Sequence, residues 1–169
     1  MSRSLQSVMK FYKAPWSRLL IIISSFVTAL GAGIAMGLIR SGHEVLPWVA
    51  TLPMAIVAGS ALFTIRGYTV TADTLLIHRL FWTTQLPLGD LESVLFEPDA
   101  MRGSIRLCGN GGLFSFTGLF RNKTLGSYHA FATDQHRTVV LRFPSRIVVV
   151  SPAAPETFAQ DVATSSHAI

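Results

Sequence analysis

The sequence predicts an α+β membrane protein, in which a two-helix transmembrane hairpin precedes a small antiparallel β-barrel capped by one C-terminal helix. Two observations predict this architecture. The first is a pair of long, uncharged, apolar stretches near the N-terminus, 19–39 and 46–65. The second is the pattern after residue 66, where short runs rich in β-branched and aromatic residues alternate with turn residues until a helical pattern appears near the end.

Composition and charge point to the membrane. Half of the 169 residues are hydrophobic and only 14% are charged, and this bias lies mostly in the first 65 residues. That segment holds five basic and one acidic residue, a net of +4, whereas residues 66–169 hold nine basic and eight acidic residues, a net of +1. The basic excess therefore follows the apolar stretches, as a topology signal does, and no nucleic-acid partner is expected.

Residues 1–18 are expected to form a basic cytoplasmic leader, because lysine and arginine mark the cytoplasmic side of a membrane. Its aromatic residues Phe11, Tyr12 and Trp16 suit headgroup depth. The spacing of apolar residues from Leu5 onward would also fit a short amphipathic helix lying on the membrane. An ordinary juxtamembrane flank is the simpler interpretation, and we favour it.

The two apolar stretches are predicted to cross the bilayer as helices, since no backbone amide can stay unpaired in hydrocarbon. The first has 21 residues, or about 31 Å of helix, and the second has 20. Four basic residues precede the first span, whereas only Arg40 lies in the connecting loop. Both termini are therefore expected in the cytoplasm, with the chain passing the membrane twice. A cleaved signal peptide is the alternative, with Gly33-Ile34-Ala35 as a small-x-small site.

Small residues recur at intervals of four in both spans, which is typical of closely packed membrane helices. They are Ala29, Gly33, Gly37, Ala55 and Gly59. We expect them to pack the two spans against each other, and an interface between copies of the chain is the alternative. Neither span contains a charged residue, so no proton relay or ion pathway is expected there.

The segment 66–163 is predicted to form one β-domain, followed by a tail at 164–169. Its expected strands are Tyr68–Thr71, Thr74–Leu80, Thr83–Leu86, Glu92–Glu97, Ser104–Cys108, Leu113–Phe116, Ser127–Thr133, Arg137–Phe143 and Arg146–Ser151. Evenly spaced short strands favour a small barrel or sandwich.

A short helix is predicted at the end of this domain. Pro155 suits the first helical position after Ala154, and Ser151 is the other candidate N-cap. Phe158, Ala159 and Val162 would form one apolar stripe that closes the open end of the barrel.

Three sequence strings in this domain resemble the bacterial PH domain family of membrane-tethered, pleckstrin-homology-like proteins. They are LPLGDLESV, the glycine-rich GNGGLFSFTGLFRNKTLGSYHAFATD, and VVVSPAAPETFAQDV. The resemblance implies a strongly bent, seven-stranded barrel with one capping helix, located at the bacterial inner membrane. It implies no settled activity.

One departure concerns lipid binding. Eukaryotic PH domains usually hold phosphoinositide headgroups with basic residues around the first hairpin. Here that hairpin is expected at Thr71-Ala72-Asp73-Thr74, which has no lysine or arginine. The resemblance therefore implies no phosphoinositide site.

No constellation typical of catalysis or metal binding appears in the sequence. None of the five histidines forms H-x-x-x-H or H-E-x-x-H, and the run CGNGG lacks the lysine of a phosphate loop. Cys108 is the one cysteine, so an internal disulfide is excluded, and a buried structural thiol is expected. We expect no catalytic residue, no cofactor and no metal, and hence a protein that is not an enzyme.

Four basic residues bracket the glycine-rich segment and are candidate contacts for anionic lipid, namely Arg102, Arg106, Arg121 and Lys123. This interpretation requires their loops to share one rim, and solvated loop charges are the alternative. The favoured function is a membrane-anchored scaffold or binding protein that self-associates or holds a protein partner at the cytoplasmic face. An anionic-lipid-sensing module and an accessory subunit of a larger membrane transporter or enzyme are the alternatives.

Overall fold

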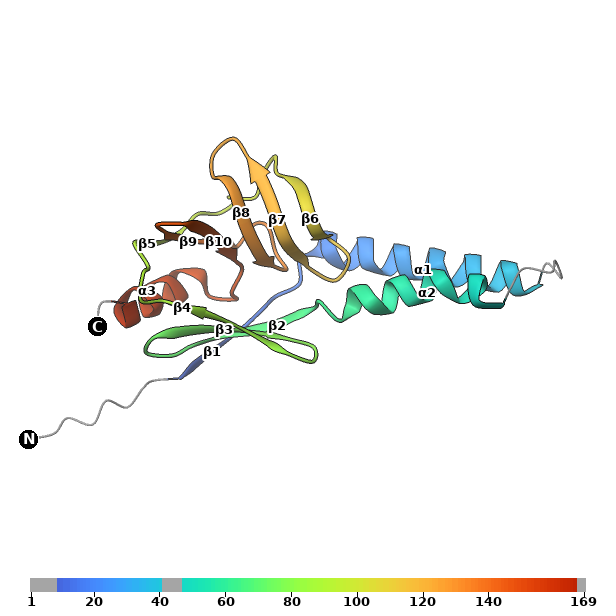
Figure 1. The fold of residues 1–169 in the computed structure, drawn as a ribbon, viewed down its shortest axis with the longest axis horizontal. Helices are drawn as coiled ribbons and strands as arrows, with labels where there is room; N and C mark the ends of the chain where they lie inside the picture. The colour runs from blue at the N-terminus through green and yellow to red at the C-terminus, as the bar shows by residue number, and fades with distance from the viewer. Residues whose placement is uncertain (1–8, 41–46, 167–169) are drawn as a thin grey trace, which may run out of the picture.

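A computed structural model describes residues 9–40 and 47–166. Two helices project from one end of a β-domain built from two sheets, and a third helix packs against the opposite end of that domain (Figure 1). The first sheet is antiparallel, in the order β1-β2-β3-β4. Its strands are β1 (Lys10–Lys13), β2 (Ile65–Val70), β3 (Thr74–Arg79) and β4 (Thr83–Pro87).

The second sheet has the order β5-β9-β10-β8-β7-β6. Its strands are β5 (Ser93–Phe96), β6 (Ile105–Gly111), β7 (Phe116–Asn122), β8 (Gly126–Ala132), β9 (Val139–Phe143) and β10 (Arg146–Val150). Strands β6, β7 and β8 form an antiparallel unit that lies between β5 and β9 in the sequence, whereas β5 and β9 are neighbours in the sheet. Strand β8 lies parallel to β10. The expected wholly antiparallel, seven-stranded barrel is therefore corrected to ten strands in two sheets within the described residues.

The leader contributes a strand that the sequence did not predict. Lys10 to Lys13 pair with Val70 to Gly67, and Tyr12 is buried between two exposed neighbours. This alternation has the period of two of a strand, so the amphipathic-helix interpretation is wrong for these residues, and the flank before α1 contains a strand. Burial of the Tyr12 ring edge-on against Phe158 stabilises the strand. Residues 1–8 lie outside the described part.

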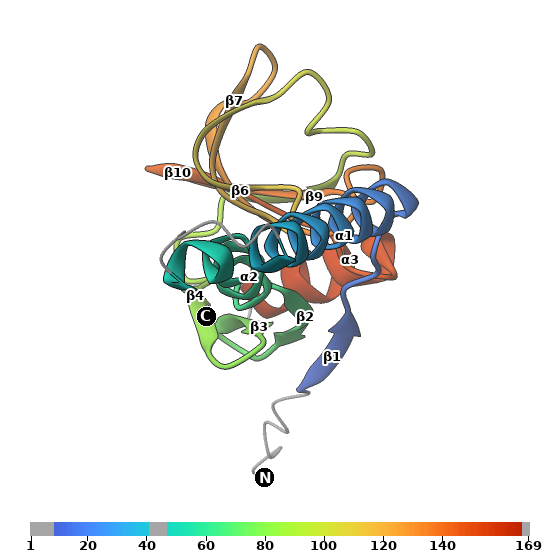
Figure 2. The same ribbon diagram turned by 90° about the vertical axis from the view of Figure 1, so that its right-hand side faces the viewer.

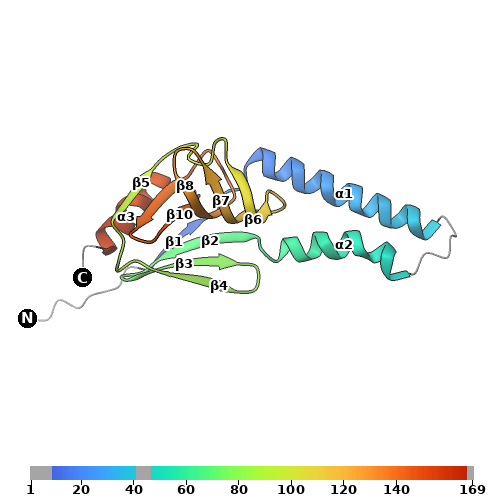
Figure 3. The ribbon, with the colours of Figure 1, turned by 45° about the horizontal axis from the view of Figure 1, so that its top comes forward.

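Because β1 precedes the helices and β2 follows them, the helical hairpin is an insertion between two paired strands. Helix α1 (Arg18–Arg40) runs away from the domain, and α2 (Pro47–Ala61) runs back along it (Figure 3). Viewed along the hairpin, both helices leave the domain between its two sheets (Figure 2). The start of α1 and the end of α2 are thus held by the same sheet.

Only α1, among the described residues, is long and apolar enough to cross a membrane. Its 23 residues reach about 34 Å, whereas the 15 residues of α2 reach about 22 Å, less than the roughly 30 Å of a bilayer core. The predicted second span, 46–65, is wrong at its C-terminal end, because the helix stops at Ala61 and Ile65 enters the domain core as the first residue of β2. Residue 46 lies outside the described part.

The contact between α1 and α2 uses a different face of α1 from the predicted one. Gly31 is buried, and a Cβ atom there would contact Val57 at 3.7 Å. Gly33 and Gly37 face open space, as does Gly59 of α2, and Ala29 and Ala55 are exposed. Gly33 lies two residues after Gly31, about 200° around the helix, so the predicted small residues of α1 point away from α2. Their role between copies of the chain stays a prediction.

The predicted C-terminal helix is confirmed as α3 (Pro155–Ser166). It begins at Pro155, and the Phe158 amide donates to the Ala154 carbonyl, which decides against Ser151 as the N-cap. Phe158 and Val162 are fully buried between the first sheet and the β9–β10 hairpin. A second core lies on the other face of the second sheet and includes Leu20 from the first turn of α1, which ties the apolar helix to the domain.

Candidate functional site

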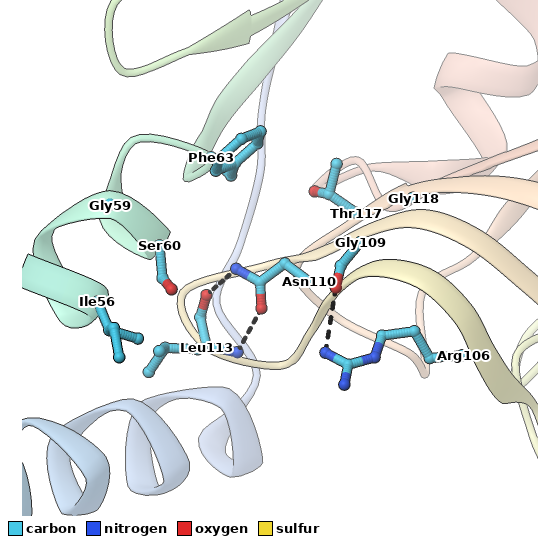
Figure 4. Close-up of a pocket in the computed structure, with 10 residues that line it drawn as sticks. All are labelled: Ile56, Gly59, Ser60, Phe63, Arg106, Gly109, Asn110, Leu113, Thr117 and Gly118. Carbon is cyan, nitrogen blue, oxygen red and sulfur yellow. Dashed lines mark hydrogen bonds between the residues drawn. The ribbon is translucent and has the colours of Figure 1, made fainter. Parts of the chain in front are cut away.

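A groove of about 600 Å³ lies between the C-terminal half of α2 and the β6–β7 hairpin (Figure 4). Its volume is within the roughly 300–1,000 Å³ of small-molecule sites. The lining residues are Ile56, Gly59, Ser60 and Phe63 from the α2 side and Arg106, Gly109, Asn110, Leu113, Thr117 and Gly118 from the hairpin. The groove is therefore mostly apolar, and Arg106 is its one ionised side chain.

Two glycines allow β6 and β7 to approach each other beside the groove. Gly109 and Gly118 are register partners with φ values of +105° and +127°. A Cβ atom on Gly118 would lie 2.3 Å from the carbonyl oxygen of Cys108, and one on Gly109 would lie 2.2 Å from that of Thr117. Only glycine fits both the backbone conformation and the spacing.

Side chains satisfy the backbone at the tip of this hairpin. The Asn110 side chain accepts from the Leu113 amide at 3.1 Å and donates to its carbonyl. The Phe114 amide donates to Ser24 Oγ of α1 at 2.9 Å, and Ser115 Oγ donates to the Phe63 carbonyl at 3.0 Å. These hydrogen bonds attach the tip to α1 and to the residues that follow α2.

Arg106 brings a cation to this apolar site. Its guanidinium donates to the Gly109 carbonyl at 3.1 Å, which aligns the side chain along β6 toward the tip. None of the ion pairs among the described residues involves Arg106. An apolar groove with one cation free of a carboxylate suits an anionic amphiphile.

The other three predicted lipid contacts lie outside this groove. Arg121 is the second-last residue of β7 and lies opposite Ile105, Lys123 lies in the β7–β8 turn, and Arg102 lies in the turn before β6. The β7–β8 turn is at the end of its hairpin away from the helices (Figure 1). The four residues thus do not share the single rim on which the prediction depended, and their contact with lipid stays untested.

A second, shallower hollow lies on the outer face of the first sheet, where β1 and β2 meet the helices. It is lined by Phe11, Lys13, Ala14, Arg66, His78 and Arg79. Lys13 and Arg66 are exposed, and neither forms an ion pair among the described residues. These basic residues lie where the helical hairpin joins the first sheet. The predicted first hairpin of the β-domain is β2–β3, and its turn, Thr71–Thr74, contains no lysine or arginine.

The sequence pattern could not reveal these sites, because each joins residues far apart in the chain. The groove depends on contacts such as Ser24 to Phe114, and the basic hollow depends on a strand that was not predicted. The one available signal was the lysine and arginine excess around the apolar stretches.

The remaining candidates for chemistry are dispersed. His136 Nδ1 lies 2.5 Å from Asp99 Oδ1, and His129 is on β8 within a regular ladder. The described residues contain no group of three histidine, cysteine or acidic side chains that could hold a metal. Cys108 is exposed on the edge strand β6, so the expectation of a buried thiol is wrong.

Comparison with known proteins gives one match. A family model described as a bacterial PH domain matches residues 66–165, more than half of the chain. No curated protein and no solved structure matches the chain. The matched segment begins at β2, so β1 and the helical hairpin lie outside it.

Proposed function

The chain belongs to the bacterial PH domain family, and from that premise we propose that it is a two-pass membrane protein whose cytoplasmic domain binds an anionic phospholipid in the α2–hairpin groove. The observation that carries this proposal is the position of the groove, beside the apolar helices, with Arg106 as its one ionised side chain. The protein would be a binding module at the membrane surface and not a catalyst.

The insertion of the hairpin between β1 and β2 supports two passes. All four residues of β1 pair with β2, so both ends of the hairpin belong on one side of the membrane. If α1 crosses, the chain must cross back before β2. Helix α2 is shorter than a bilayer core, and local thinning of the bilayer or the residues that flank the helix would make up the difference.

The charges support a cytoplasmic domain. Lys13, Arg18 and Arg66 are exposed where the helices join the domain, whereas Arg40 alone marks the far end of α1 within the described residues. Lysine and arginine concentrate on the cytoplasmic side of membrane spans. Both termini would then lie in the cytoplasm of a bacterial cell.

The side chains exposed around the groove support a lipid as its ligand. Ile56 on α2 is 58% exposed, and Leu52 one turn earlier is 51% exposed, so the apolar helix surface continues from the groove toward the membrane. An acyl chain could follow this surface while its phosphate meets Arg106. A basic group near an anionic membrane surface contributes about 1 kcal/mol.

Native mass spectrometry of the full-length protein, extracted gently from its membrane, tests this proposal. We expect a retained anionic phospholipid, lost in Arg106→Gln and in Gly59→Leu, which fills the groove from α2. Arg121→Gln is the matched control, because that arginine lies on the same hairpin outside the groove. Absence of retained lipid, or equal loss in Arg121→Gln, would refute lipid binding in the groove.

A second candidate function, self-association through a sheet edge, rests on β6. Among the residues that the structure describes, this strand pairs with β7 alone, and it exposes Ile105 by 64% and Leu107 by 50%. An exposed edge strand can accept a strand from another chain. The exposed Cys108 on the same strand allows a direct test, since oxidation would cross-link two copies joined along β6. As the control, Leu107→Lys should prevent this cross-link. Absence of a cross-link between natural chains in the membrane would exclude this mode.

A further inference from the structure

The turn between β3 and β4 is unusually apolar for an exposed loop. Leu80, Phe81 and Trp82 follow one another there and are 39%, 75% and 40% exposed. Turns normally carry glycine, proline, asparagine, aspartate or serine, which suit water and tight backbone conformations. Three successive large apolar side chains at a hairpin tip therefore indicate a partner surface.

This tip lies next to the point where α2 enters the domain. The Trp82 ring packs edge-on against Phe63, with 5.4 Å between centroids, and Phe63 follows α2 by two residues. Two views agree that the β3–β4 tip extends toward the end of the domain from which the helices project (Figures 1 and 3). The tip is thus continuous with the surface of the membrane anchor.

Arg79 holds the tip in place from the domain side. Its guanidinium carbon lies 5.5 Å from the Trp82 ring centroid, 5.7 Å from that of Phe63 and 5.2 Å from that of Phe131. The Arg79 amide also donates to the Trp82 carbonyl at 2.9 Å. Trp82 is therefore fixed by stacking and by the backbone, while Phe81 projects farthest into solvent.

We propose that the β3–β4 tip is a third membrane contact, inserted into the interfacial layer of the same bilayer that holds α1. Tryptophan and other aromatic side chains favour this layer, where one end of the ring meets hydrocarbon and the other meets water. This third contact, on the first sheet and separate from α1 and α2, limits tilting of the whole protein relative to the bilayer. It therefore holds the groove on the second sheet at a constant depth.

Site-directed spin labelling of the full-length chain tests the contact. In a Cys108→Ser background, labels are placed at Phe81→Cys and at Ala72→Cys, in the turns at the two ends of β3. Both positions are exposed, so labelling preserves the fold. The protein is reconstituted in liposomes of phosphatidylethanolamine and phosphatidylglycerol. Collision rates are then measured with oxygen, which concentrates in the bilayer, and with a nickel chelate, which stays in water.

We expect the ratio of oxygen to nickel collisions to be several-fold higher at position 81 than at position 72. Equal ratios would place the tip in water and overturn the proposal. Spin–spin broadening at position 81 that disappears on dilution with unlabelled protein would show that a second copy covers the tip, and would overturn it as well. This result does not depend on retained lipid, so it stands or falls separately from the groove.

Discussion

The Tyr12 hydroxyl in β1 donates a hydrogen bond to the Asp161 carboxylate in α3, which joins a strand before the membrane helix to the last helix of the domain. Lys10 Nζ lies 2.7 Å from the same carboxylate. Beside them, the Ala153 amide donates to the Lys13 carbonyl at 2.9 Å. The leader is therefore part of the folded domain, and the start of α1 is held firmly against it.

Asp161 should make the stability of the domain depend on pH in the acid range. Burial alone would raise the pKa of Asp161, but hydrogen bonds from Lys10 and Tyr12 outweigh it and hold the pKa below the usual 3.8. A carboxyl group whose pKa is lowered by folding stabilises the fold at pH values above its pKa in the unfolded chain. This contribution disappears as the pH falls through the pKa of the folded protein. We expect the unfolding temperature to fall below about pH 4 and Asp161→Asn to flatten part of that slope.

Thermal unfolding of the full-length protein in detergent, followed by circular dichroism between pH 2 and 7 (roughly the range of carboxyl titration), measures the effect. Asp90→Asn is the control, since Asp90 is exposed and forms no ion pair among the described residues. An unchanged acid slope in Asp161→Asn would contradict the assignment.

Ser24 should contribute more to stability than its neighbour Ser25. Ser24 is 3% exposed and its hydroxyl oxygen accepts from the Phe114 amide, whereas Ser25 is exposed. Ser24→Ala leaves a partly buried amide without an acceptor, which costs about 1–3 kcal/mol. Chemical or thermal unfolding of the two alanine variants compares them. Equal stabilities would show that the β6–β7 hairpin tip does not depend on its contact with α1.

Much of this fold was predictable from local pattern. The uncharged run that became α1 and the Pro155, Phe158 and Val162 pattern of α3 need no distant partner to be recognised. Strand β1 was missed because four residues, two of them lysines, match a membrane flank as well as a strand, and only β2 and α3 decide between them. Strand β7 was missed because Gly118 in its middle is typical of a turn, although here it permits a close approach of two paired strands.

The candidate site was less predictable. Arg106 was recognised by its charge, but the surface opposite it comes from a helix that local hydropathy assigns wholly to the membrane. The predicted strands Thr74–Leu80 and Thr83–Leu86 left Phe81 and Trp82 in the connection between them, but the packing of Trp82 against Phe63 could not be foreseen from the sequence. Contacts of this kind arise only when the two sheets are assembled.

Gly118 should tolerate substitution far less than Gly126, although both have positive φ values. A Cβ on Gly126 meets open space. Gly126→Ala should therefore lower the free energy of unfolding only by the cost of placing alanine in the left-handed conformation, about 1–2 kcal/mol. Gly118→Ala adds a backbone clash, so it should destabilise the protein more and displace the hairpin tip. Urea unfolding of both variants measures the difference. A Gly118→Ala variant as stable as Gly126→Ala would show that the paired strands β6 and β7 do not approach each other so closely.

The exposed Cys108 and the far end of α1 should report opposite sides of the membrane. Cys108 is on the domain, whereas Arg40 ends α1 at the other end of a helix about 34 Å long. With a membrane-impermeant maleimide, the natural Cys108 should react in inside-out vesicles and stay unlabelled in intact spheroplasts. In a Cys108→Ser background, Arg40→Cys should show the reverse. If both cysteines label from the same side, α1 does not cross the membrane, and the hairpin instead lies in one leaflet with the domain beside it.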